Sequence, residues 1–344
     1  MKVAVVNNSV PFLRGGAEHL ADSLVDQLAL RGHEVMLVKV PLRWATPGDV
    51  AESMFAASAL QIPEADVVIP LKFPAYLVQH PRKVVWLLHQ FRQVYDLWSV
   101  PGHGLEINDA SLELRRAIHA ADAKALGEAR RIFCNSAVTA ARLDEHNGMH
   151  ADVLLPPHGD ARQFRHESYG DYVLAIGRIN GAKRQHLLIP ALARSQSSLR
   201  LVIAGAPEGP EDLRVLQELV AEHGLQDRVE LIPEFIDDSL KAKLLAGARA
   251  VAYLPLDEDS YGYVTAEGMY SSKPIITLDD SGGVLQLVED GVTGFVRTAD
   301  ADDLGTAFDA LDDVRTAEVL GSAALDRVES LRLSWDHVIS ELLA

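Results

Sequence analysis

Short apolar segments alternate with longer segments of helical periodicity along nearly the whole chain, and this pattern restricts the fold more than any other feature. Near the start, Val3 to Val6 and Glu34 to Val40 predict strands, and Ala17 to Leu30 between them has helical spacing. A strand, a helix and another strand in this order predict parallel strands joined by a crossover helix. The sequence therefore predicts an α/β protein with parallel sheets.

The alternation restarts about half-way along the 344 residues, which indicates two domains rather than one. The loop PPHGDARQF separates the two series, and the strand YVLAIG begins the second. We expect domains at residues 1–165 and 166–327. The remaining segment, 328–344, contains SWDHVISELLA and predicts an amphipathic helix.

Charge and composition exclude several classes of protein. The net charge is −17, with 17 basic and 18 acidic residues up to Arg165 and then 15 and 31 beyond it. Such a balance argues against nucleic-acid binding, although the near-neutral first half leaves a peripheral contact with a membrane surface open. Without a long apolar run or a signal-peptide pattern, we expect a cytoplasmic protein, with the inner face of the membrane also open. Cys134, the single cysteine, excludes an internal disulfide.

Ligands of open α/β sheets bind beside the carboxyl ends of the strands, so the turns after the strands are the candidate sites. In the first of these turns, Gly15 and Gly16 precede a predicted helix, where the backbone could approach a diphosphate closely. An ordinary helix cap is the alternative. The G-x-G-x-x-G fingerprint is absent, which argues against a nicotinamide enzyme.

Two further turns carry charged residues. The turn RINGAKRQ follows YVLAIG and contains Arg178 and Lys183, which could neutralise a pyrophosphate or could be solvated surface charges. The turn EFIDDSL contains Asp237 and Asp238, and one of these predicts a helix N-cap.

The turn DEDSYGYVTAEG is the most specific signal in the chain. It places Asp259 and Glu267 eight positions apart, around Gly262, at the start of a predicted helix. A helix N-terminus favours an anion, and a carboxylate within the first turns can accept hydrogen bonds from sugar hydroxyls. These residues therefore suit a phosphate joined to a sugar.

This segment resembles the E-x7-E motif of retaining glycosyltransferase family 4, with Asp259 where the family usually has Glu. RINGAKRQ resembles the family's G-R-x4-K element, and the elements follow the family's order over nearly the whole chain. The resemblance implies the GT-B fold, in which two Rossmann-like, doubly wound parallel-sheet domains face a cleft. It also implies that the first domain serves the acceptor, that the second binds the nucleotide-sugar donor, and that the C-terminal helix packs back on the first.

The resemblance further implies roles for individual residues. Arg178 and Lys183 would hold the donor phosphates, Asp259 would face the transferred sugar, and Glu267 would hold the nucleotide ribose. Further donor contacts are implied at Gly15, Gly16, Phe235, Ile236, Tyr261, Gly262, Tyr263 and Val264.

A histidine and a glutamine complete the comparison with the family. His89 follows the predicted strand VVWLL; a histidine there is usually structural, but the family often places one near the donor sugar, where it polarises a hydroxyl or stabilises charge. Gln286 stands where the family often has Glu, which is a second departure from the pattern.

The resemblance implies a retaining, metal-independent hexosyltransferase without a cofactor. The expected donor is a nucleotide diphosphate sugar of the UDP or GDP type, and the acceptor is a glycan, a lipid-linked saccharide or a small molecule in glycan, glycolipid or polysaccharide biosynthesis. Alternatives are a nucleotide-sugar epimerase, a glycosyl phosphorylase and a non-catalytic nucleotide-sugar binding protein. The oligomeric state stays open.

Overall fold

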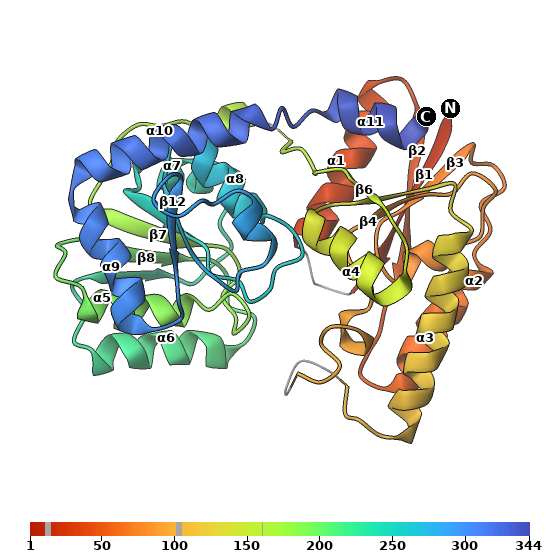
Figure 1. Ribbon diagram of the computed structural model, residues 1–344, viewed down its shortest axis with the longest axis horizontal. Helices are drawn as coiled ribbons and strands as arrows, with labels where there is room; N and C mark the ends of the chain where they lie inside the picture. The colour runs from red at the N-terminus through yellow and green to blue at the C-terminus, as the bar shows by residue number, and fades with distance from the viewer. Residues whose placement is uncertain (11–14, 101–104, 160) are drawn as a thin grey trace. The chain divides into compact units, whose positions relative to one another are not determined.

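The computed structural model describes residues 1–10, 15–100, 105–159 and 161–344, and the chain divides into two compact units (Figure 1). Unit 1 comprises Met1–Pro157 together with Leu333–Ala344, and unit 2 comprises His158–Arg332. The first division lies in the loop PPHGDARQF, eight residues before the end of the expected first domain at residue 165.

Unit 1 has parallel strands in the orders β2-β1-β3 and β4-β5-β6, and the isolated parallel bridges Val68–Lys83 and Lys72–His89 continue the pairing between these sheets. Its strands are β1 (Lys2–Ser9), β2 (Glu34–Pro41), β3 (Val67–Pro70), β4 (Val84–Leu87), β5 (Arg131–Cys134) and β6 (Asp152–Val153). Its helices are α1 (Gly16–Leu30), α2 (Pro47–Ala59), α3 (Asp109–Gly127), α4 (Ala137–Asn147) and α11 (Trp335–Leu343), with the short 3₁₀ helices η1 (Ala75–Leu77) and η2 (Arg92–Val94).

Both faces of β1, β3 and β4 are buried, which explains why the central residues of these strands are apolar. Side chains alternate along β1, so that Val3 and Val5 belong to one core and Ala4 and Val6 to the other. Helices α1 and α11 cover the first face, and α2, α3 and α4 cover the second. In α11, Trp335 packs edge-on against Trp86 of β4.

Unit 2 has one parallel sheet in the order β12-β11-β10-β7-β8-β9. Its strands are β7 (Tyr172–Ile176), β8 (Arg200–Ala204), β9 (Val229–Ile232), β10 (Ala250–Ala252), β11 (Ile275–Leu278) and β12 (Gly294–Arg297). Its helices are α5 (Leu188–Arg194), α6 (Pro210–Glu222), α7 (Asp238–Gly247), α8 (Tyr263–Tyr270), α9 (Ala301–Asp312) and α10 (Val314–Ser330), with the 3₁₀ helices η3 (Ala161–Gln163), η4 (Gln185–Leu187) and η5 (Gly283–Gln286).

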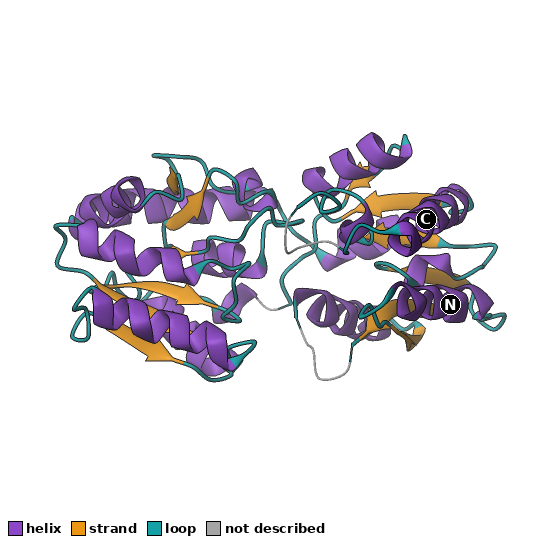
Figure 2. Cartoon of the chain, turned by 90° about the horizontal axis from the view of Figure 1, so that it is seen from below, coloured by secondary structure: helices purple, strands orange, loops and turns teal. Residues whose placement is uncertain are grey.

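Helices cover both faces of the strands in each unit (Figure 2). In unit 2, α5, α6 and α9 share one core, and α8 lies on the opposite face, where Gly268 approaches Val251 and Ile275. The predicted α/β class with doubly wound parallel sheets is confirmed. The expected C-terminal helix over 328–344 is shorter, because residues up to Ser330 still belong to α10 and α11 begins at Trp335. Among the described helices, none has the length and apolar character to cross a bilayer.

Candidate active site

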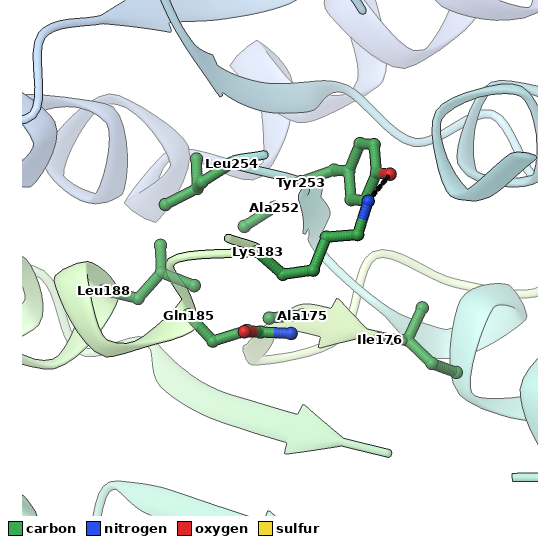
Figure 3. Close-up of a pocket in the computed structure, with 8 residues that line it drawn as sticks. All are labelled: Ala175, Ile176, Lys183, Gln185, Leu188, Ala252, Tyr253 and Leu254. Atoms are coloured by element: carbon green, nitrogen blue, oxygen red, sulfur yellow. Dashed lines mark hydrogen bonds between the residues drawn. The ribbon is translucent and has the colours of Figure 1, made fainter. Parts of the chain in front are cut away.

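The strand order of unit 2 reverses between β7 and β10, and a small pocket lies at the carboxyl ends of these two strands (Figure 3). Reversal points of this kind are where open α/β sheets bind their ligands. Ile176 ends β7 and Ala252 ends β10, while Lys183 comes from the turn after β7. Figure 3 shows the Lys183 side chain reaching the hydroxyl of Tyr253. The predicted phosphate-binding lysine is therefore at the expected edge of the sheet.

Lys183 belongs to a cluster of three hydrogen-bonded side chains. Its Nζ donates to Tyr253 Oη at 2.8 Å and to the Glu258 carboxylate, and Tyr253 Oη donates to Glu258 Oε2 at 3.0 Å. Burial lowers the pKa of Lys183, but Tyr253 and Glu258 more than offset this effect and hold it above its usual value. Lys183 is a permanently charged group fixed beside the pocket.

Two arginines flank Lys183 with different environments. Arg178 is half-exposed, and its Nη1 lies 3.8 Å from Glu208 Oε2. Arg184 is buried; it donates to the carbonyl oxygens of Leu254 (2.9 Å) and Pro255 (2.8 Å), and it forms a bidentate pair with Asp280, at 2.8 and 2.5 Å. Arg184 ties the turn after β7 to the loops after β10 and β11. We did not predict this role, because its partners lie 70 or more positions away.

The loop between β10 and α8 is held by close backbone packing at glycines. Gly262 caps α8 with φ 68°, and a Cβ atom there would lie 2.3 Å from Cε1 of Tyr253. Gly283 donates its N–H to the carbonyl oxygen of Glu258 at 2.8 Å, and a Cβ atom on Gly283 would lie 2.5 Å from the carbonyl carbon of Ser260. Gly262 and Gly283 thus let two loops meet beside the pocket.

The predicted contact residues of this loop occupy different environments. Tyr261 is buried, Asp259 is half-buried, and Tyr263 and Val264 form the first turn of α8. Helix α8 begins directly after Gly262, as predicted. Gln286, the second departure from the family pattern, ends η5, and its carbonyl oxygen accepts a hydrogen bond from Arg327 Nη2 at 2.9 Å.

Glu267 is almost completely buried, with 2% of its surface exposed. Its Oε1 accepts hydrogen bonds from His158 Nε2 at 3.0 Å and from Lys241 Nζ at 2.7 Å. Burial raises the pKa of Glu267, but His158 and Lys241 more than offset this and hold it below its usual value. Glu267 is therefore an ionised carboxylate. No sequence pattern pointed to His158 or Lys241, because both meet Glu267 only in the folded chain.

The turn after β9 carries the two predicted base contacts. Phe235 is 83% exposed and Ile236 is half-buried. Asp237 caps α7 by accepting a hydrogen bond from the Leu240 N–H at 2.8 Å, which confirms the predicted cap. A large aromatic side chain is thus exposed to solvent two residues before the capping residue of α7.

The remaining predicted residues lie at the carboxyl ends of the unit 1 strands. Gly15 caps α1 in an extended conformation, and its N–H donates to Glu18 Oε2 at 2.8 Å. Lys72 Nζ reaches Glu18 Oε1 at 3.2 Å, so a carboxylate already neutralises the start of α1. His89 pairs with Lys72 in an isolated bridge, and its Nδ1 carries hydrogen because it lies 2.7 Å from the carbonyl oxygen of Gln90. Neither Glu18 nor Lys72 was predicted.

Residues 160–324 match the family whose description is Glycosyl transferases group 1. The matched segment covers most of unit 2. It contains every predicted site residue from Arg178 to Glu267, including the cluster around Lys183.

Relatives and solved structures with glycosyltransferase names are also similar to this chain. The D-inositol 3-phosphate glycosyltransferase of Xylanimonas cellulosilytica is 30% identical over 215 residues, which are 57% of this chain and 48% of that protein. The chain spans about half the length of the curated relatives it matches. HepE of Anabaena, solved in complex with UDP-glucose, has a TM-score of 0.74 at 18% identity and covers 99% of this chain and 98% of its own. Sucrose-phosphate synthase of Thermosynechococcus elongatus has a TM-score of 0.77 at 18% identity, covering 98% and 97%. The expected GT-B fold is confirmed.

Proposed function

We propose that the protein is a retaining glycosyltransferase that moves a sugar from a nucleotide diphosphate sugar to an acceptor hydroxyl. The observation that carries the proposal is the presence, in the loops and helix after β7 and β10 of one sheet, of both a fixed cation and a buried, ionised carboxylate. The cation, Lys183, suits a diphosphate, and the carboxylate, Glu267, suits a hydroxyl.

In the proposed reaction, a bond forms between the acceptor oxygen and the anomeric carbon on the face from which the diphosphate leaves. The bond from that carbon to the diphosphate oxygen breaks, and the acceptor proton passes to the departing phosphate. Lys183 and Arg178 stabilise the charge that develops on the diphosphate, and Asp259 holds the transferred sugar. We propose that these cations and the start of α8 do so without a resident metal ion.

Further assignments extend the proposal over both units. In unit 2, Glu267 holds the nucleotide ribose and Phe235 meets the base. In unit 1, which we assign to the acceptor, His89 polarises a hydroxyl or stabilises charge. The donor class is UDP or GDP, and HepE, whose structure contains UDP-glucose, supports testing UDP first. The acceptor class is a glycan, a lipid-linked saccharide or a small molecule, at the cytoplasmic side of a membrane or in the cytoplasm.

Thermal stabilisation by nucleotides tests the proposal first. A ligand that binds only the folded protein raises the free energy of unfolding, by about 2.7 kcal/mol at a hundredfold excess over Kd. The melting temperature rises as a result. We expect one nucleoside diphosphate, UDP or GDP, to stabilise the protein more than the others, and its sugar conjugate to be consumed when an acceptor is supplied. Stabilisation by no nucleotide would overturn the proposal. Conversion of the donor sugar without an acceptor would instead identify an epimerase.

A further inference from the structure

The two carboxylate oxygens of Glu267 have different surroundings. Oε1 accepts two hydrogen bonds, from His158 and Lys241, whereas Oε2 is buried and has no hydrogen-bond partner among the residues that the structure describes. A buried carboxylate oxygen without a donor costs free energy unless a ligand supplies the donor. The arrangement therefore points to a hydroxyl that arrives with the ligand.

Aromatic rings fix the two groups that bind Oε1. The His158 ring stands edge-on to Phe164, with centroids 4.8 Å apart, and edge-on to Tyr263, at 5.7 Å. Lys241 Nζ lies 5.6 Å from the Phe164 ring centroid and 3.4 Å from Asp238. The donors to Oε1 thus come from a packed cluster rather than from mobile surface groups.

We infer that His158 and Lys241 are positioning residues that saturate Oε1 of Glu267 and so direct Oε2 to a ribose hydroxyl, which makes the site select ribonucleotides over deoxyribonucleotides. The inference rests on the proposed function, because it takes the ligand to be a nucleoside diphosphate. It adds to that function the groups that set sugar discrimination in the nucleotide.

Loss of His158 or Lys241 should weaken ribose discrimination because the two oxygens of a carboxylate are chemically equivalent. With two donors on Oε1, the carboxylate has one stable orientation. When one donor is removed, the remaining donor can be accepted by either oxygen, and the carboxylate loses both its fixed orientation and part of the compensation for its buried charge. A ribose hydroxyl then finds no preformed acceptor, so the advantage of the ribonucleotide over its deoxy counterpart decreases.

The experiment measures the ratio of Kd values for deoxy and ribose forms of one nucleotide. Isothermal titration would use UDP and GDP with their 2′-deoxy and 3′-deoxy counterparts, on the wild type and on Lys241→Met and His158→Gln. We expect the wild type to bind the ribose form roughly 10-fold or more tightly than either the 2′-deoxy or the 3′-deoxy form. A hydrogen bond to a charged group has an effect of this size. Both variants should reduce this ratio several-fold, and Lys241→Arg should retain most of it.

Lys243→Met is the matched control, because Lys243 is an exposed lysine on the same helix, α7. It should leave the ratio unchanged. Circular dichroism checks that each variant is folded, because the Lys241 side chain is only one-fifth exposed and pairs with a buried carboxylate. If Lys241→Met and His158→Gln weaken ribose and deoxy forms equally, the inference fails and the proposed function stands. A wild type that binds neither nucleotide would overturn both, and a wild type that binds without a ribose preference would overturn the inference alone.

Discussion

At the scale of single residues, a substitution of Lys183 would remove a charge with less effect on the packing of the loops than a substitution of the neighbouring Arg184. Its ammonium group contacts Tyr253 and Glu258 beside the pocket, whereas buried Arg184 is bonded to two carbonyl oxygens and to Asp280. A substitution of Arg184 would therefore disturb loops as well as charge. Lys183 is the better position for testing chemistry.

We predict that Lys183→Ala lowers donor turnover by about 100-fold or more, because removal of one preorganised charge-stabilising group typically has an effect of this size. Initial rates at saturating donor measure the change. Lys243→Ala, at an exposed lysine of the same unit, should keep the wild-type rate. Wild-type turnover in a folded Lys183→Ala variant would contradict the role given to Lys183.

A second prediction at this scale concerns the glycine that caps α8. Gly262→Ala must place a methyl group against the ring of Tyr253 at a positive φ of 68°. Gly224 also has a positive φ, 66°, but nothing lies within 4 Å of its added Cβ, so Gly224→Ala tests the cost of a positive φ without a steric clash. We expect Gly224→Ala to lower the free energy of unfolding by about 1 kcal/mol and Gly262→Ala to lower it by about 2 kcal/mol more. Urea denaturation measures both, and equal losses would refute the steric argument.

At the scale of helices and strands, the sequence pattern predicted the alternation and the four turns, because both depend on local residue order. The apolar strands of both units, the start of α8 after Gly262 and the cap of α7 at Asp237 all follow from neighbouring residues. The groups that hold the site together could not be predicted. His158 and Glu267 are 109 positions apart, and no local pattern connects them.

Helix α3 contains a buried acid that makes unit 1 sensitive to pH. Asp122 accepts hydrogen bonds from Tyr76 Oη at 3.0 Å and Tyr95 Oη at 2.8 Å, and burial raises its pKa to about 7 despite these bonds. Between the ordinary value of 3.8 and about 7, the folded protein keeps a proton that the unfolded chain has released. The free energy of unfolding therefore decreases as the pH rises through this window.

We predict that Asp122→Asn removes this decrease, which is at most roughly 4 kcal/mol for a shift of this size. Denaturant unfolding at about pH 5 and about pH 8 would show it. Glu113→Gln, at an exposed position of the same helix, should leave the wild-type pH dependence in place. An unchanged pH dependence in Asp122→Asn would mean that Asp122 is not the responsible group.

At the scale of the whole molecule, unit 1 is built from two distant parts of the chain. Leu333–Ala344 returns to it and completes the core on one face of its strands through α11. Arg31 joins Asp336, and Arg131 joins Glu341 at 2.9 Å, so ion pairs accompany the apolar contact. The last helix is thus part of the folded core of the first unit.

We predict that Trp335→Ala lowers the free energy of unfolding of unit 1 by about 3–5 kcal/mol, because it removes a buried indole from contact with Trp86. Trp44→Ala, at a tryptophan that is 41% exposed, should cost far less. Chemical denaturation followed by circular dichroism compares the two. Similar small losses would show that α11 contributes little to this core.

The return of α11 to unit 1 also sets an order of events during synthesis. A ribosome makes unit 2 as one uninterrupted stretch, His158–Arg332, after the first part of unit 1 and before its last part. Unit 2 can therefore be complete before Trp335 has been made and can pack against Trp86. Unit 1 can therefore complete its core only after all of unit 2 has been made, and the apolar face that α11 covers stays open until then.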